Sequence, residues 1–160
     1  MRPVIFFLLF LQAGLALAQT PITPAGAPIV VYQTSDDYDA IRSNLELAIT
    51  GRGMLISSTL HISDMFNRTA ADTGLANTFY AKAEAFEFCN LKLSWQMSAA
   101  HPANLSICPL TVGIYTLQGQ PDDVFLSYRR PAILGEAEEA AAAELALIKL
   151  YEGIIREAME

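Results

Sequence analysis

The chain has 160 residues, of which 10 are Lys or Arg and 17 are Asp or Glu, so its net charge at pH 7 is −7. Such an acidic chain is a poor candidate for binding nucleic acid, because that affinity depends on neutralising phosphates with basic side chains. The same argument disfavours anionic membrane surfaces.

Residues 1–18 have the pattern of a secretory signal peptide. Arg2 supplies a positive charge, Val4 to Leu11 is an apolar run, and Ala16-Leu17-Ala18 has the small-x-small form of a cleavage site. We expect cleavage near Ala18, which leaves a periplasmic or secreted protein without a stable membrane anchor. An uncleaved anchor is the alternative, but the segment is shorter than the roughly 20 apolar residues of a typical span.

The ~140 residues that remain suit one domain with a single core. Residues 19–28 contain three prolines and a glycine and predict a flexible leader, so the domain is expected at 29–160. Ile29 to Tyr32 is β-branched and aromatic, which predicts a strand. Apolar residues at helical spacing predict a helix from Asp36 to Thr50, capped by Ser35.

The middle of the chain alternates between strands and helices. Met54 to Ile62 alternates apolar and polar residues, which predicts a half-buried strand, and a short helix is expected over 64–71. Ala83 to Cys89 again alternates and predicts a strand. Asn90 is a suitable cap for a helix from Leu91 to about Ala100, and His101-Pro102 ends it.

Two strands, Ile107 to Leu117 and Val124 to Tyr128, flank the turn-forming residues 118–123 and predict an antiparallel hairpin. The last element is a long helix from about Glu136 to Met159, rich in alanine, glutamate and leucine. The expected order is β-α-β-α-β-α-β-β-α. We therefore predict an α+β fold with a single, mainly antiparallel sheet packed with helices.

Cys89 and Cys108 are the two cysteines of the chain, and in an exported protein such a pair predicts a disulfide. One cysteine ends a predicted strand and the other begins one, so the bridge would close a loop of about 19 residues. On the chain-entropy argument, that closure stabilises the fold by roughly 3 kcal/mol. A redox-active pair is the alternative, although there is no C-x-x-C spacing to lower a thiol pKa.

A metal site is a weaker alternative. His61, Cys89, His101 and Cys108 form a sufficient ligand set for zinc, but their spacing matches no metal motif and oxidation of the cysteines would abolish the site. We expect no metal and no cofactor.

Conventional catalysis has little support in the sequence, which lacks G-x-S-x-G, H-E-x-x-H and a glycine-rich phosphate loop. Asp64 near His61 suggests an acid–base pair or, more simply, a helix cap. Arg129-Arg130 suggests a site for an anionic ligand or a pairing with the protein's own acidic groups. Any site is expected in a pocket beside the cysteines. The candidate pocket residues are His61, Asp64, Met97, Arg129 and Arg130.

A set of short motifs resembles exported members of the domain of unknown function 302 family. The resemblance covers about Tyr38 to Glu157, and the two cysteines are typical of the family's exported branch. It implies a compact α+β domain and supplies neither an activity nor catalytic residues. The motifs are Gly51-Arg52-Gly53, Ile56, His61, Asp64-Met65, Arg68-Thr69, Phe86-Glu87-Phe88-Cys89, Ser94, Met97, Cys108-Pro109, Val112-Gly113-Ile114-Tyr115 and Tyr128-Arg129-Arg130-Pro131.

Taken together, the sequence predicts a small exported α+β domain and favours a binding or accessory module over an enzyme, since no catalytic constellation supports a hydrolase. Its expected partner is a small molecule or a periplasmic protein. The alternative is a thiol-redox or metal-handling protein that uses Cys89 and Cys108.

Overall fold

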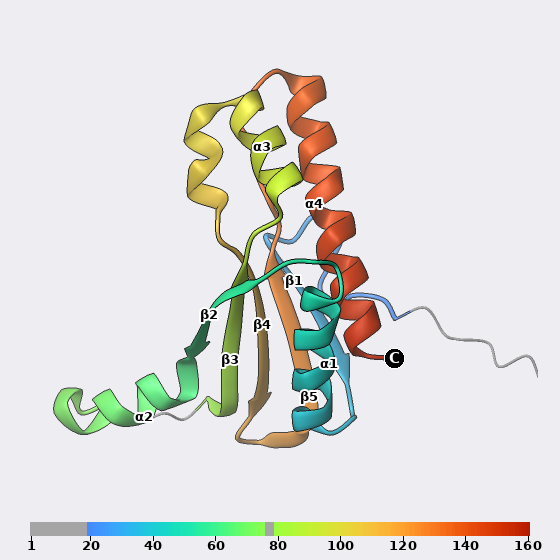
Figure 1. Ribbon diagram of the computed structural model, residues 1–160. Helices are drawn as coiled ribbons and strands as arrows, with labels where there is room; N and C mark the ends of the chain where they lie inside the picture. Colours follow the sequence, from blue (N-terminus) through green and yellow to red (C-terminus); the bar gives the residue numbers. More distant parts are fainter. Residues whose placement is uncertain (1–18, 76–78) are drawn as a thin grey trace, which may run out of the picture.

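The computed structural model describes residues 19–75 and 79–160 (Figure 1), and the predicted signal peptide lies outside the described residues. The elements follow the predicted order, with one additional 3-10 helix, η1. They are β1 (Ile29–Thr34), α1 (Tyr38–Thr50), β2 (Ile56–His61), α2 (Ile62–Thr73), β3 (Tyr80–Phe88), α3 (Leu91–Ala100), η1 (Pro102–Ile107), β4 (Leu110–Leu117), β5 (Gln120–Arg129) and α4 (Ala137–Ala158).

The five strands form one sheet in the order β1-β5-β4-β3-β2, and every neighbouring pair is antiparallel. The predicted α+β class is therefore confirmed. β4 and β5 form the predicted hairpin, whose tip pairs Leu117 with Gln120, so the turn is shorter than the sequence suggested. β4 lies at the centre of the sheet because β3 pairs with its other edge.

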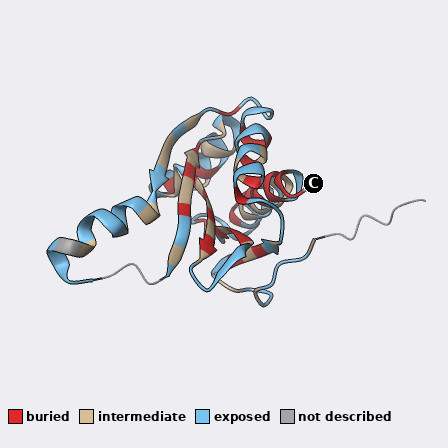
Figure 2. Ribbon diagram, turned by 90° about the horizontal axis from the view of Figure 1, so that it is seen from below, coloured by how far each residue is buried: buried red, intermediate tan, exposed pale blue. Residues whose placement is uncertain are grey.

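Helices α1 and α4 pack against each other on one face of the sheet (Figures 1 and 2). The side chains of β4 show which face this is: Leu110, Val112 and Ile114 are at most 1% exposed, whereas Thr111 and Tyr115, on the opposite face, are partly exposed. The buried core thus lies between the sheet and the two helices. Its fully buried helix residues include Leu45, Ile49, Leu147, Ile154 and Ile155.

Helix α4 is displaced along the sheet toward one end. Its N-terminal part extends past the strands, where it packs on α3 (Figure 1). We call residues 90–107, which contain α3 and η1, the helical cap.

The side chain of Asn104 fastens the helical cap to the segment before α4. It is 2% exposed, its Nδ2 donates to the carbonyls of Met97 and Leu134 at 2.8 Å each, and its Oδ1 accepts from the Leu134 N–H at 2.9 Å. One amide thus satisfies three backbone groups of two separate segments.

The predicted starts of helices α1 and α2 were wrong for local reasons. Helix α1 begins at Tyr38 because Asp37, not Ser35, accepts the Ala40 N–H in the cap, while the Ser35 hydroxyl donates to Asp123. Helix α2 begins directly after His61, with no side-chain cap, and continues to Thr73. Among the helices of residues 19–75 and 79–160, none has the length and apolarity needed to cross a membrane.

Candidate functional site

The two cysteines lie together at the base of the helical cap. Phe88 and Leu110 form the last pair between β3 and β4, and Cys89 and Cys108 lie just beyond this pair. Both are free thiols in the structure, so the predicted disulfide is not formed there. Partial burial and the neighbouring thiol of Cys108 raise the pKa of the Cys89 thiol. The two thiols are therefore neighbours.

The surroundings of Cys89 keep its thiol protonated. Since the pKa of Cys89 is raised, it is a thiol and not a thiolate at neutral pH, and only the thiolate is an effective nucleophile or metal ligand. The Cys108 sulfur lies 3.1 Å from the hydroxyl of Ser94 on α3. The pair therefore connects the sheet to the helical cap and lacks the activation of a catalytic cysteine.

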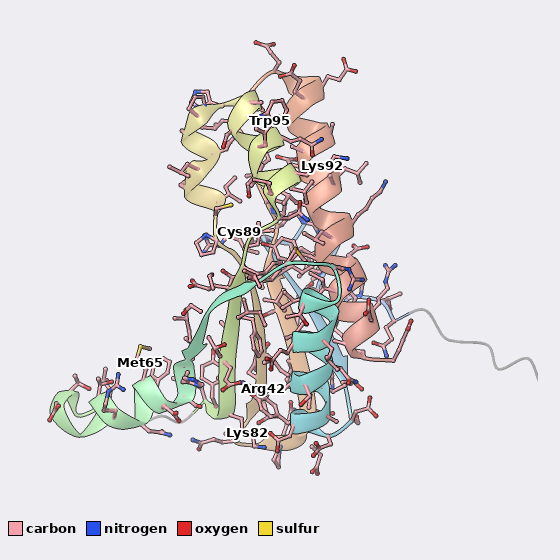
Figure 3. All side chains as sticks on the ribbon, viewed as in Figure 1. Arg42, Met65, Lys82, Cys89, Lys92 and Trp95 are labelled. Atoms are coloured by element: carbon pink, nitrogen blue, oxygen red, sulfur yellow. The ribbon has the colours of Figure 1, made fainter. Side chains whose placement is uncertain are left out.

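A groove of about 370 Å³ lies between α3 and the part of α4 that extends past the sheet. Trp95, the single tryptophan of the chain, borders it and is 71% exposed (Figure 3). An exposed aromatic side chain that borders an apolar groove is a typical feature of a binding surface. The groove is lined by Trp95, Gln96, Ala99, Ala100, Glu139, Ala142, Ala143 and Ala146.

The small side chains of α4 create the hollow. Ala142, Ala143 and Ala146 form its floor, where any larger side chain would occupy the space. The lining is mostly apolar, and the Glu139 carboxylate and the Gln96 amide are its polar side-chain groups. The carboxylate can accept a hydrogen bond from a ligand. This combination is typical of sites for small apolar molecules.

His61 lies in a different place, at the end of β2, where it contacts Glu84 of β3. The sheet register pairs the two residues, and His61 Nδ1 is 2.7 Å from Glu84 Oε1. Arg42 of α1 (Figure 3) pairs with the other oxygen of this carboxylate and lies over the Phe86 ring at 5.2 Å. The hydrogen-bond partner of His61 is therefore Glu84, while Asp64 lies exposed in the first turn of α2.

The four side chains considered as metal ligands do not come together. Glu84, the partner of His61, is five residues before Cys89 along β3, a separation of about 16 Å at 3.3 Å per residue. The exposed His101 accepts the Ala103 N–H at Nδ1 and caps η1. In the part of the chain that the structure describes, no three His, Cys, Asp or Glu residues are placed to share a metal ion.

The other predicted pocket residues are also dispersed. Met97 is 1% exposed in the core. Arg130 donates from Nε to the carbonyl of Ala27 at 3.0 Å and so holds the leader against the sheet. Arg129 is exposed on the sheet face that α1 and α4 do not cover. The structure thus does not place His61, Met97 and Arg129 around one pocket.

Comparison with known sequences shows to which protein family the chain is related. The sequence profile described as domain of unknown function DUF302 matches residues 30–157, which is most of the chain. The chain belongs to the DUF302 family. No protein among those with curated descriptions matches it.

A solved structure supports the fold of this DUF302 chain. The crystal structure of an uncharacterized conserved DUF302 protein from Bacillus stearothermophilus is similar, with a TM-score of 0.62 and 12% sequence identity. The match covers 83% of this chain and 98% of that one. At this identity the likeness establishes a shared fold, and the site has to be argued from this chain's own residues.

Sequence reasoning missed the groove, although signals for it exist. The alanines from Ala140 to Ala143 are strong helix formers, and the sequence alone gives them no further meaning. Leu91 and Trp95 recur at the i, i+4 spacing on α3, yet they are 87% and 71% exposed. In this chain, the alanine run and the aromatic residue indicate a groove only once the two helices are known to be neighbours.

Proposed function

We propose that this DUF302 chain is an exported binding module whose ligand site is the groove between α3 and α4. The observation that carries the proposal is the apolar groove of about 370 Å³ with an exposed tryptophan at its border. Pockets for small molecules commonly measure about 300–1,000 Å³ and combine an apolar lining with few polar groups. The ligand class that fits is a small apolar molecule with a hydrogen-bond donor for the Glu139 carboxylate.

The single tryptophan reports on this site directly. We would titrate the chain, purified after export, with N-phenyl-1-naphthylamine, a neutral apolar probe that has one N–H donor. Binding should quench Trp95 emission and raise the probe's own emission. Absence of any saturable change in either signal would contradict the proposal.

A matched pair of variants separates the groove from other apolar surface. Ala142→Leu places three more carbon atoms on the groove floor, and we expect the probe's Kd to rise about tenfold or more. Ala141→Leu adds the same atoms at an exposed position next to it that does not line the groove. Equal affinities of the two variants would show that the probe binds elsewhere.

We further propose that Cys89 and Cys108 form a disulfide in the exported protein. Their thiols are neighbours beyond the last pair of β3 and β4, and by thiol–disulfide exchange with a disulfide-bearing oxidant they lose two electrons and two protons while the oxidant becomes a dithiol. The bridge would fix the base of the helical cap and so the α3 wall of the groove. Intact mass with and without reduction tests it, since the native protein should lack two hydrogens.

The alternative function is thiol redox chemistry, and the exposure of Cys89 beside a second thiol favours it. The raised pKa of Cys89 opposes it because rapid exchange needs a thiolate. We therefore expect the purified protein not to accelerate the reduction of insulin by dithiothreitol. Catalysis in that assay, lost in Cys89→Ser, would favour the redox alternative over a structural bridge.

A further inference from the structure

A second surface lies at the other end of the sheet, away from the helical cap. The sheet face opposite α1 and α4 carries a row of aromatic side chains with ring centroids 5.6 Å apart between Tyr80 and Tyr115 and 5.1 Å apart between Tyr115 and Phe125. Phe66 of α2 extends the row, at 6.0 Å from Tyr80. The row therefore runs continuously from α2 across β3, β4 and β5.

Two exposed aliphatic residues lie on the same uncovered face. Leu60 of β2, 40% exposed, lies beside the row, whereas Ile29 of β1, 44% exposed, pairs with Arg129 and lies four residues, or about 13 Å, nearer the helical cap than Phe125. We call the side chains of Leu60, Ile29, Tyr80 and Tyr115 the open sheet face; the Phe125 ring, 6% exposed, is already covered within one protomer. No helix of residues 19–75 or 79–160 lies across its centre (Figure 2).

Helix α2 projects away from the body of the protein at the edge of this face (Figures 1 and 2). Its own chain supports it mainly near its start, where Ser63 hydrogen bonds to the backbone of Ala83 and Phe66 contacts Tyr80. Farther along, the helix is largely exposed, and Met65 is 43% exposed (Figure 3). A helix of 12 residues is marginal in water unless it packs on something.

We propose that this chain forms a symmetric dimer in which α2 of each protomer lies across the open sheet face of the other. The projecting helix and the uncovered face belong to one chain and meet at Phe66. A two-fold axis beside this residue therefore places α2 of each protomer on the open sheet face of the other. Such self-complementary contact is the usual geometry of homodimers. One copy alone leaves both surfaces exposed.

The charges of the two surfaces are complementary. Arg129 is exposed on the uncovered side of β5 and has no ion-pair partner among the described residues. The exposed side of α2 carries Asp64, Arg68 and Asp72, so two carboxylates outnumber one guanidinium there. When α2 of the partner lies on the open sheet face, its aspartate carboxylates come close to the Arg129 guanidinium, which has no ion-pair partner among the described residues of its own protomer.

The size of the contact sets the expected affinity. Each helix arm is about 18 Å long and 10 Å wide, so two arms and the faces under them bury roughly 700 Å², and contacts of Leu60 and Ile29 add to this. Stable specific interfaces bury about 1,200 Å² or more. We therefore expect a reversible dimer with a Kd on the order of 1–100 μM.

Sedimentation equilibrium of the exported chain tests the dimer between concentrations on the order of 1 μM and 300 μM. We expect a monomer at the low end and a dimer at the high end. Met65→Asp should raise the Kd at least tenfold, whereas Leu91→Asp, at a more exposed apolar residue of the helical cap, should leave it unchanged. Far-ultraviolet circular dichroism and thermal unfolding establish that both variants are folded.

Two results would overturn the inference. One is a monomer over the whole concentration range. The other is a dimer that Leu91→Asp disrupts while Met65→Asp leaves it intact, because that places the interface at the helical cap. The groove experiment is independent of both, since Trp95 and α2 lie at opposite ends of the sheet (Figure 3).

Discussion

Asn104 offers the sharpest test of how the helical cap is held. The substitution Asn104→Ala removes one amide that makes three hydrogen bonds, two from Nδ2 and one to Oδ1. Asn104 is 2% exposed. Its loss leaves the N–H and carbonyl of Leu134 without their partner, while the Met97 carbonyl still accepts the His101 N–H at 3.1 Å. The perturbation therefore acts on the junction of α3, η1 and the segment before α4.

The expected loss in the free energy of unfolding follows from these three hydrogen bonds. A buried hydrogen bond contributes about 1 kcal/mol net, and leaving the backbone partners unsatisfied raises the cost. We expect Asn104→Ala to lower the free energy of unfolding by about 3 kcal/mol. With an m-value of about 2 kcal/mol/M, the urea midpoint should fall by roughly 1.5 M.

Urea unfolding followed by Trp95 emission and by circular dichroism measures this change under reducing conditions. Ser98→Ala serves as the control because Ser98 is an exposed residue of α3 in the helical cap, and its effect should stay within about 0.5 kcal/mol. A loss below about 1 kcal/mol for Asn104→Ala would refute the reasoning. It would mean that water replaces the amide and that the helical cap is held by other contacts.

Three further predictions concern the core, the turn before α4 and the tyrosines. Leu147→Ala should cost about 3 kcal/mol in chemical unfolding, because Leu147 is fully buried, and a cost below 1 kcal/mol would place it outside the core. Gly135→Ala should cost about 1–3 kcal/mol: φ is +144° and the new Cβ would lie 3.0 Å from the carbonyl oxygen of Ala100, so an unchanged melting temperature would contradict this geometry. Burial raises the pKa of both Tyr128 and Tyr151 to about 12, so their contribution to stability is complete below pH 10 and is lost as pH rises towards 12. Spectrophotometric titration should show these two tyrosines ionising above pH 10, together with unfolding, and normal titration of all tyrosines in the folded protein would argue against their burial.

The fold was predictable because its signals are local and repeat along each element. Alternation in β3 placed Phe86 and Phe88 on one face, and both are at most 1% exposed. Asn90 was predicted to cap α3, and its side chain does accept the Leu93 N–H. The start of α2 was missed because β2 runs straight into it without a capping side chain.

The site was less predictable because its parts are brought together by packing and register. The sequence placed Cys89 and Cys108 at the ends of neighbouring strands, which was sufficient to bring their thiols close. The partner of His61 depends instead on the pairing of β2 with β3, which puts Glu84 opposite it. The groove depends on how α3 packs on α4, and no spacing within either helix contains that information.

The pairing of Phe88 with Leu110 makes the helical cap an insertion into what is otherwise a plain β-hairpin. Two antiparallel neighbours can be joined by a turn of two residues, so the strand order does not constrain the length or the sequence of residues 90–107. This segment can change in length and composition while the sheet and the far end that carries α2 stay as they are. The proposed ligand site and the proposed dimer contact of α2 would then evolve separately, at opposite ends of an unchanged sheet.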